Sequence, residues 1–125
     1  MIDASAILAA ILGEAGGDSV FDRLDEAVAS TVNIAEVYTY AAINDLPTDA
    51  IDAFFADTGI EIAAFDQAQA VMAGQLASMT RKAGLSLGDR SCLALAKLRQ
   101  AEVLTADHPW QHVASAAGLT ITLLR

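Results

Sequence analysis

Short apolar segments typical of strands alternate along the chain with longer segments typical of helices, and this alternation restricts the fold more than any other feature. The expected strands are residues 1–2, 28–32, 60–65, 103–105 and 119–124. The expected helices are residues 5–12, 18–27, 33–44, 48–57, 66–83, 87–100 and 109–117. Strands separated by helices imply right-handed crossovers and a parallel sheet with helices on both faces. The pattern predicts an α/β fold, a three-layer α/β/α sandwich with a short central parallel sheet of about five strands, formed by residues 1–125 as a single domain.

The composition is apolar, with 54% hydrophobic residues and a mean hydropathy of +0.42. The longest apolar runs, such as residues 6–12, fall far short of the ~20 residues that a spanning helix needs. Asp3 follows the first residues at once and no basic region precedes it, so no signal peptide is expected. The single cysteine, Cys92, lies on an apolar helical stripe and is expected to be a buried thiol. These features predict a cytoplasmic protein whose surplus apolar surface covers a subunit interface.

The formal net charge is −9 at pH 7. This charge disfavours a protein that coats nucleic acid without specificity, because such binding depends on Lys and Arg at phosphates. It favours the binding of divalent cations or of a basic partner.

Acidic residues follow several of the expected strands. Asp3 follows the first strand, Glu36 lies in the helix after the second, and Asp107 follows residues 103–105. Asp89 opens the helix before that strand. Functional sites of open parallel sheets form at the carboxyl ends of the strands, so these four acids are expected at one rim. Ser5 and Thr105 are expected beside them as hydroxyls that orient carboxylates, substrate or water.

Each acid also has a local structural explanation, and taken singly this explanation is the stronger one. The local roles are a cap of the first helix for Asp3, a capping box with Asn33 for Glu36, a first-turn acid after Ser86 for Asp89, and a turn residue before Pro109 for Asp107. None of these roles explains why all four acids reach one edge. Two like charges 4 Å apart repel by about 4 kcal/mol at an effective dielectric of 20, so such a group must hold protons or a cation. Oxygen ligands without Cys or His select Mg²⁺ or Mn²⁺.

The whole chain resembles the PIN-domain ribonucleases, and most closely the VapC-type toxins of bacterial type II toxin–antitoxin pairs. The matching segments are residues 3–8 (DASAIL), 33–37 (NIAEV), 84–96 (GLSLGDRSCLALA) and 103–110 (VLTADHPW), of which the last two are the most specific. The resemblance implies a Mg²⁺- or Mn²⁺-dependent endoribonuclease that cleaves RNA with a metal-activated water. It implies metal ligation by Asp3, Asp89, Asp107 and Glu36, the last through water or as the base, with Ser5 and Thr105 at the family's hydroxyl positions. It also implies a homodimer and a VapB-like antitoxin that obstructs the site.

Contacts to RNA phosphates must be local, because removing the four site charges from −9 still leaves −5. Arg81, Lys82 and Arg90 flank the Asp89 segment and are the candidate RNA contacts. The equally simple alternative is that they are solvated charges at helix ends.

Two other functions remain open from the sequence. A phospho-receiver signalling module is also acidic, α/β/α and Mg²⁺-binding, and Asp66 follows the third strand as an acceptor might. Against it, Asp66 has its own capping pattern with Gln69, and no lysine follows the last strand. The other alternative is a catalytically idle PIN fold that acts as a binding partner.

Overall fold

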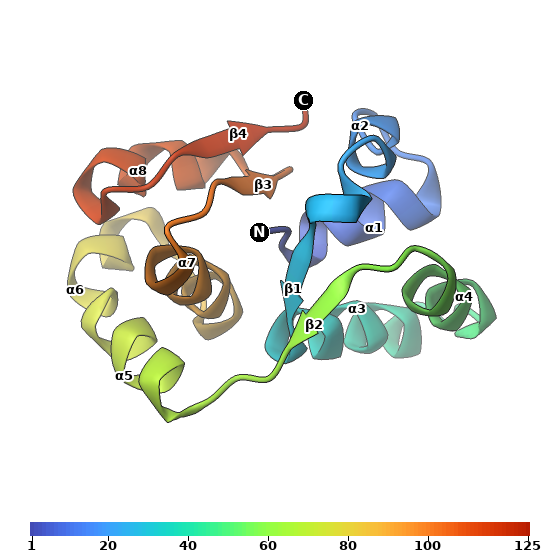
Figure 1. Ribbon diagram of the computed structural model, residues 1–125, viewed down its shortest axis with the longest axis horizontal. Helices are drawn as coiled ribbons and strands as arrows, with labels where there is room; N and C mark the ends of the chain where they lie inside the picture. Colours follow the sequence, from blue (N-terminus) through green and yellow to red (C-terminus); the bar gives the residue numbers. More distant parts are fainter.

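The computed structural model describes residues 1–125 and contains short strands between many helices (Figure 1). The elements in chain order are α1 (Ala4–Leu12), α2 (Asp18–Phe21), η1 (Leu24–Glu26), β1 (Val28–Ser30), α3 (Thr31–Ile43), α4 (Asp49–Asp57), β2 (Glu61–Ala63), α5 (Gln67–Gln75), α6 (Ala77–Thr80), η2 (Arg81–Ala83), α7 (Leu87–Arg99), β3 (Val103–Thr105), η3 (His108–Trp110), α8 (Gln111–Ala117) and β4 (Ile121–Leu123), where η marks a 3₁₀ turn. The α/β class predicted from the sequence is confirmed.

The strands form two parallel pairs rather than one sheet of five strands. β1 pairs with β2, and β3 pairs with β4. The segment Met1–Ile2 lies between the pairs: the Ile2 amide donates to Val28 O at 3.0 Å, and the Leu104 amide donates to Met1 O at 2.8 Å. Ile2 and Leu104 form an isolated parallel bridge. Two residues are too few for a ladder, so the predicted continuous five-stranded sheet is not formed.

Several predicted elements are shorter than the sequence pattern suggested. Residues 28–32 were expected as a strand, but the Ser30 hydroxyl accepts from the Val32 amide and caps α3 at this point. Residues 18–27 form only α2 and η1, because the chain turns at Asp22–Arg23. Residues 66–83 were expected as one helix. They divide into α5, α6 and η2, because the amide of buried Leu76 forms a tight turn to Met72 O and Gly74 O.

Other local signals in the sequence are confirmed. Gly118 ends α8 in the left-handed conformation, with φ 69°. Ser86 and Asp89 form a reciprocal capping box at the start of α7. Asp66 caps α5, accepting from the Gln69 amide at 2.9 Å, although the Gln69 side chain donates to Ala64 O instead of closing the box. The carboxylate of Asp66 therefore has a structural role.

Two hydrophobic clusters lie on opposite sides of the strands. Figure 1 shows α1 to α4 on one side and α5 to α8 on the other. The first cluster centres on α1, α3 and α4 with Ile7, Val37 and Phe54; the second centres on α7 with Leu93 and Trp110. Cys92 is buried in the second cluster, as expected. No helix combines the length and apolar character that a membrane crossing requires.

Candidate active site

Asp3 is the most deeply buried of the predicted site acids, with 2% of its surface exposed. It follows Ile2, at the carboxyl end of the bridging segment, and caps α1 by accepting from the Ala6 amide at 2.9 Å. The Ser5 hydroxyl donates to the same carboxylate at 2.8 Å, and the Thr105 hydroxyl does so from the end of β3, also at 2.8 Å. The two hydroxyls in turn accept from the amides of Ala106 and Asp107. Ser5 and Thr105 therefore tie Asp3 to the loop after β3, where the sequence predicted them.

Burial raises the pKa of Asp3 from 3.8 to about 6, and the nearby charge of Asp107 adds to this rise. The hydrogen bonds from Ala6, Ser5 and Thr105 oppose it, because they favour the ionised carboxylate. Three donors therefore do not offset the loss of hydration. The folded chain holds a carboxylate at neutral pH at a cost in stability, and a bound cation would reverse that cost.

Glu36 lies one turn after Asn33 on α3 and is held against the start of α7. The Asn33 side-chain amide donates to Glu36 Oε2 at 2.9 Å and to Gly88 O at 3.1 Å. A Cβ atom at Gly88 would lie 1.9 Å from Glu36 Oε1, so the carboxylate occupies the space that any other residue would fill. Asn33 does not cap α3, which begins at Thr31, so the predicted capping box of Asn33 and Glu36 is wrong. Asn33 instead joins Glu36 to α7.

Asp89 and Asp107 approach the site from the second half of the chain. Asp89 lies in the first turn of α7 and accepts from the Ser86 amide at 2.7 Å. Asp107 is half-buried after β3 and precedes η3, with no side-chain cap bond to that turn. Burial first, and then the charge of Asp89, raise the pKa of Asp107, whereas Arg125 and His108 lower it.

The four acids are close enough to affect one another. Burial is the main cause of the raised pKa of Glu36, and the charges of Asp89 and Asp107 raise it further. The pKa of Cys92 is well above its usual value, first through burial and then through the charges of Asp3, Asp89 and Glu36. The charges of three of the acids therefore act on the same buried thiol, and the charge of the fourth acts on two of the three.

The carboxylates do not converge on a single point in this conformation. No three Asp, Glu, His or Cys side chains are arranged to enclose an ion. The reason is visible in their hydrogen bonds, since Asp3, Glu36 and Asp89 are each turned toward a donor of the protein.

The donor set nevertheless fits a hard divalent cation. All four candidate ligands are carboxylates, and hard cations prefer oxygen ligands. The side-chain oxygen of Asn33 is buried beside Glu36 without any hydrogen-bond partner, which is uncommon for a buried polar atom. The excess negative charge of the carboxylates and the unpartnered oxygen of Asn33 are both features that a bound cation would compensate.

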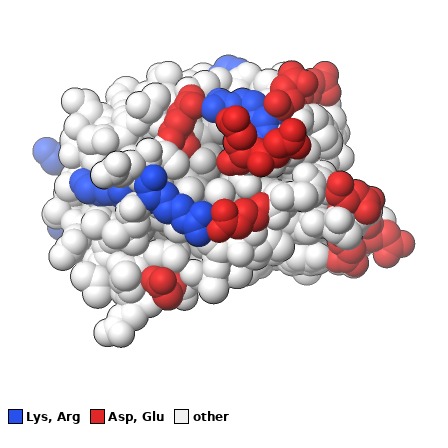
Figure 2. Space-filling view, in the orientation of Figure 1, with Lys and Arg blue, Asp and Glu red and all other residues white.

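The predicted RNA contacts do not share one environment. Arg90 is half-buried, and its guanidinium donates to Ala73 O at 2.9 Å, so it fastens α7 to α5. Arg81 and Lys82 are exposed in η2. Neither is among the charges that change the pKa of Asp3, Glu36 or Asp107. Figure 2 shows blue side chains abutting red ones rather than a continuous basic surface on the face that it presents.

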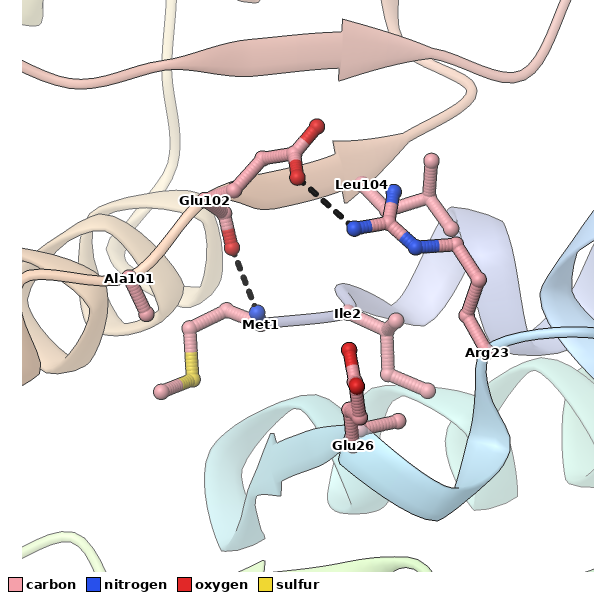
Figure 3. Close-up of a pocket in the computed structure, with 8 residues that line it drawn as sticks. Met1, Ile2, Arg23, Glu26, Ala101, Glu102 and Leu104 are labelled. Atoms are coloured by element: carbon pink, nitrogen blue, oxygen red, sulfur yellow. Dashed lines mark hydrogen bonds and ion pairs between the residues drawn. The ribbon is translucent and has the colours of Figure 1, made fainter.

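A hollow of about 230 Å³ lies at the other end of the strands (Figure 3). Its walls include Met1, Ala27 and Ala101, which precede the strands, whereas the acids follow them. The Arg23 guanidinium pairs there with Glu102 at 2.7 Å. The hollow is lined by one ion pair and by Glu26, a single unpaired acid, so it offers no second cluster of carboxylates.

Acids held at the carboxyl ends of parallel strands by α1, α3, α7 and the loop after β3 form an acidic cluster on an α/β scaffold. The family model of the PIN domain matches residues 1–116, and the chain therefore belongs to the PIN domain family. This family has a metal-dependent nuclease fold, so the α/β scaffold described here is that of a nuclease. A comparison with curated proteins gives no match.

Two contributors to the site were not identified from the sequence. Gly88 was not predicted as a site residue. A glycine next to an acid in the first turn of a helix could have indicated that another group packs closely against the helix backbone there. Arg125 was not predicted as a site residue, yet its charge acts on Asp107. Its position depends on tertiary contacts that no local pattern contains.

Proposed function

We propose that the protein is a Mg²⁺- or Mn²⁺-dependent endoribonuclease that acts as the toxin of a toxin–antitoxin pair. The observation that carries the proposal is the mutual electrostatic effect of Asp3, Glu36, Asp89 and Asp107, which arrive from four separate segments. Local structural roles account for each acid, but they do not account for this gathering of like charge in a partly buried place. Membership of the PIN domain family supports the nuclease class.

Asp3, Asp89 and Asp107 are the residues that would hold the cation, with Glu36 beside them. A divalent ion at carboxylates supplies charge stabilisation to a phosphodiester transition state and lowers the pKa of water. Ser5 and Thr105 keep the Asp3 carboxylate in one orientation from both sides. Burial raises the pKa of Glu36, so this carboxylate is a stronger base than an ordinary one and is the residue that would take a proton from water. The expected products carry a 5′-phosphate and a 3′-hydroxyl.

The first test is cleavage of RNA by the purified protein with and without divalent cation. We expect cleavage with Mg²⁺ or Mn²⁺ and none with a chelator. We expect kcat/KM to fall by about 10³-fold in Asp107→Asn, because the substitution removes a charge that stabilises the transition state. Asp66→Asn is the matched control, since Asp66 caps α5 and lies after β2. Equal cleavage by wild type and a folded Asp107→Asn protein would remove Asp107 from the active site and contradict the proposal.

The stability of the metal-free protein should depend on pH in the direction set by Asp3. Its folded pKa of about 6 exceeds the ordinary 3.8, so the protonated carboxyl favours the folded state. The stabilisation is complete below the unfolded pKa and is lost as pH rises through the folded one. We expect the free energy of unfolding in chelator to fall by up to about 3 kcal/mol between about pH 4 and pH 7.5 from this group alone.

Denaturant unfolding across this pH range measures the effect. Glu36 and Asp107 shift in the same direction and add to it. Adding Mg²⁺ at pH 7.5 should restore stability, because an ion that binds only the folded state stabilises it. A metal-free protein with greater stability at pH 7.5 than at pH 5 would contradict the inferred cost of the ionised Asp3.

A VapB-like antitoxin and a homodimer are also part of the proposal. Large apolar side chains are exposed, including Ile43, Val71 and Leu87. An apolar hollow of about 190 Å³ lies between α1, α3 and α4, lined by Leu8 and Tyr40 among others. The net charge of −9 suits a basic antitoxin segment that places an arginine among the site acids. Mass measurement of the purified protein tests the dimer.

Two alternatives make different predictions. A catalytically idle PIN fold would bind partners and leave RNA intact under every metal condition. A phospho-receiver would gain acid-labile phosphate from a small phosphodonor. Membership of the PIN domain family disfavours the receiver, and the role of Asp66 as the cap of α5 removes its candidate acceptor.

A further inference from the structure

A fixed cation of the protein beside the four carboxylates would help the site to bind the phosphates of RNA. Most basic residues of this chain are committed elsewhere. Two pair with acids at the amino ends of the strands, Arg23 with Glu102 and Arg99 with Glu61. Two others, Arg90 and Lys97, donate to backbone carbonyls of α5 and α8. Arg81, Lys82 and Arg125 remain as candidates for a phosphate.

Arg125 follows β4 at the same edge as the site acids. β4 runs parallel to β3, and the Leu124 amide donates to Thr105 O at 2.9 Å. Thr105 is the residue whose hydroxyl holds Asp3, and Asp107 lies two positions beyond it. The register of β3 and β4 therefore places Arg125 next to the loop that carries Asp107.

The loop Gly13–Gly17 holds Arg125 in position. One guanidinium nitrogen, Nη1, donates to Glu14 Oε2 at 3.1 Å and to Ala15 O at 3.0 Å. Gly16 adopts φ +83°, and a Cβ there would lie 2.4 Å from Leu124 O, so the loop packs directly on the backbone before Arg125. The protein bonds of the guanidinium involve Nη1 alone, and 39% of the side chain is exposed. The remaining nitrogens are free for an anion.

We propose that Arg125 is a phosphate-binding residue of the active site, aimed by the loop Gly13–Gly17, and that its ligand is an RNA phosphodiester beside the bond that is cleaved. The inference rests on the proposed nuclease function. A guanidinium held at one nitrogen presents its other donors to phosphate at a reduced entropic cost. Glu14 acts on RNA through Arg125 and is a positioning residue.

The test compares Arg125→Gln with Arg99→Gln. Both arginines form exposed pairs with a glutamate, with side-chain exposures of 39% and 41%, so the two variants change net charge and lose a surface pair equally. We expect Arg125→Gln to raise KM for RNA about tenfold with kcat changed much less, as for loss of one charge-assisted contact. Arg99→Gln should leave both constants as in wild type.

Binding provides a readout independent of turnover. In an Asp107→Asn background, the slope of log K against log salt should fall by about 0.7 on Arg125→Gln and stay unchanged on Arg99→Gln. Arg125→Lys keeps the positive charge and should retain the slope. If Arg125→Gln does not fold, Arg125→Lys is compared with wild type instead. Wild type that leaves RNA intact overturns the nuclease function. Active wild type with identical KM and slope for the two Gln variants overturns only the role of Arg125.

Discussion

Asp3→Asn is expected to abolish metal-dependent RNA cleavage and at the same time to make the metal-free protein more stable. The loss of a cation ligand should lower kcat/KM by about 10³-fold or more. The gain should reach about 2 kcal/mol in the free energy of unfolding at pH 7.5, since the pKa of about 6 marks the cost of ionising this buried side chain. Few substitutions of a buried polar residue change activity and stability in opposite directions.

The hydrogen bonds around Asp3 allow this substitution without a local defect. Asn is as good an N-cap as Asp, so the bond from the Ala6 amide is retained. The new amide donors face the hydroxyls of Ser5 and Thr105, which rotate to accept. The variant therefore keeps the cap and removes only the charge.

Denaturant unfolding in chelator and a cleavage assay on the same preparations measure both effects. Asp66→Asn again serves as control, because it replaces the N-cap aspartate of α5 and should change neither quantity strongly. The rise in stability should vanish near pH 4, where Asp3 is protonated in wild type. Cleavage at the wild-type rate by a folded Asp3→Asn protein would remove Asp3 from the site.

Gly88→Ala should reduce cleavage about 10- to 100-fold by displacing Glu36, a side chain on another helix. A Cβ at this position would lie 1.9 Å from Glu36 Oε1 and 2.3 Å from its Cδ. The atoms in the way belong to the end of a flexible side chain, so the helix stays in place and the carboxylate moves. The bond between Asn33 and Glu36 is then broken or bent.

A double variant separates this effect from a general disturbance of α7. In a Glu36→Ala background the space at Gly88 is empty, and Gly88→Ala should stabilise the protein by about 0.5 kcal/mol through helix propensity. In the wild-type background, Gly88→Ala should not stabilise the protein. The cleavage rate of the double variant should equal that of Glu36→Ala alone. Additive losses of activity would mean that Gly88 does not act through Glu36.

The sequence was informative where local chemistry determines the structure. The N-cap spacing at Ser86 and Asp89, the left-handed Gly118 and the limits of β3 could all be predicted because they depend on neighbours within four residues. The edge at which Asp3 and Asp107 meet could be predicted because parallel strands end together. Asp3 and Asp107 therefore lie at the edge where the pattern placed them.

The remaining features depend on contacts between distant segments. Asn33 reaches Gly88 across 55 positions, so its bridging role has no local signature. Arg90 was expected at RNA because it flanks Asp89, but the packing of α5 on α7 takes its guanidinium to Ala73 O. The strands were predicted too long because residues 31–32 and 64–65 suit a strand by themselves, whereas the helices capped by Ser30 and Asp66 limit β1 and β2.

The bridging segment Met1–Ile2 has a consequence for how the enzyme tolerates mutation. Asp3 and Glu36 come from the half of the chain on one side of this segment, Asp89 and Asp107 from the half on the other, and one hydrophobic cluster is centred on each side. Side-chain bonds such as Thr105 to Asp3 and Asn33 to Gly88 set the spacing of the acids between the halves, so repacking either cluster changes that spacing before it unfolds either half. Loss of nuclease function should therefore precede loss of structure when core residues far from any carboxylate are varied.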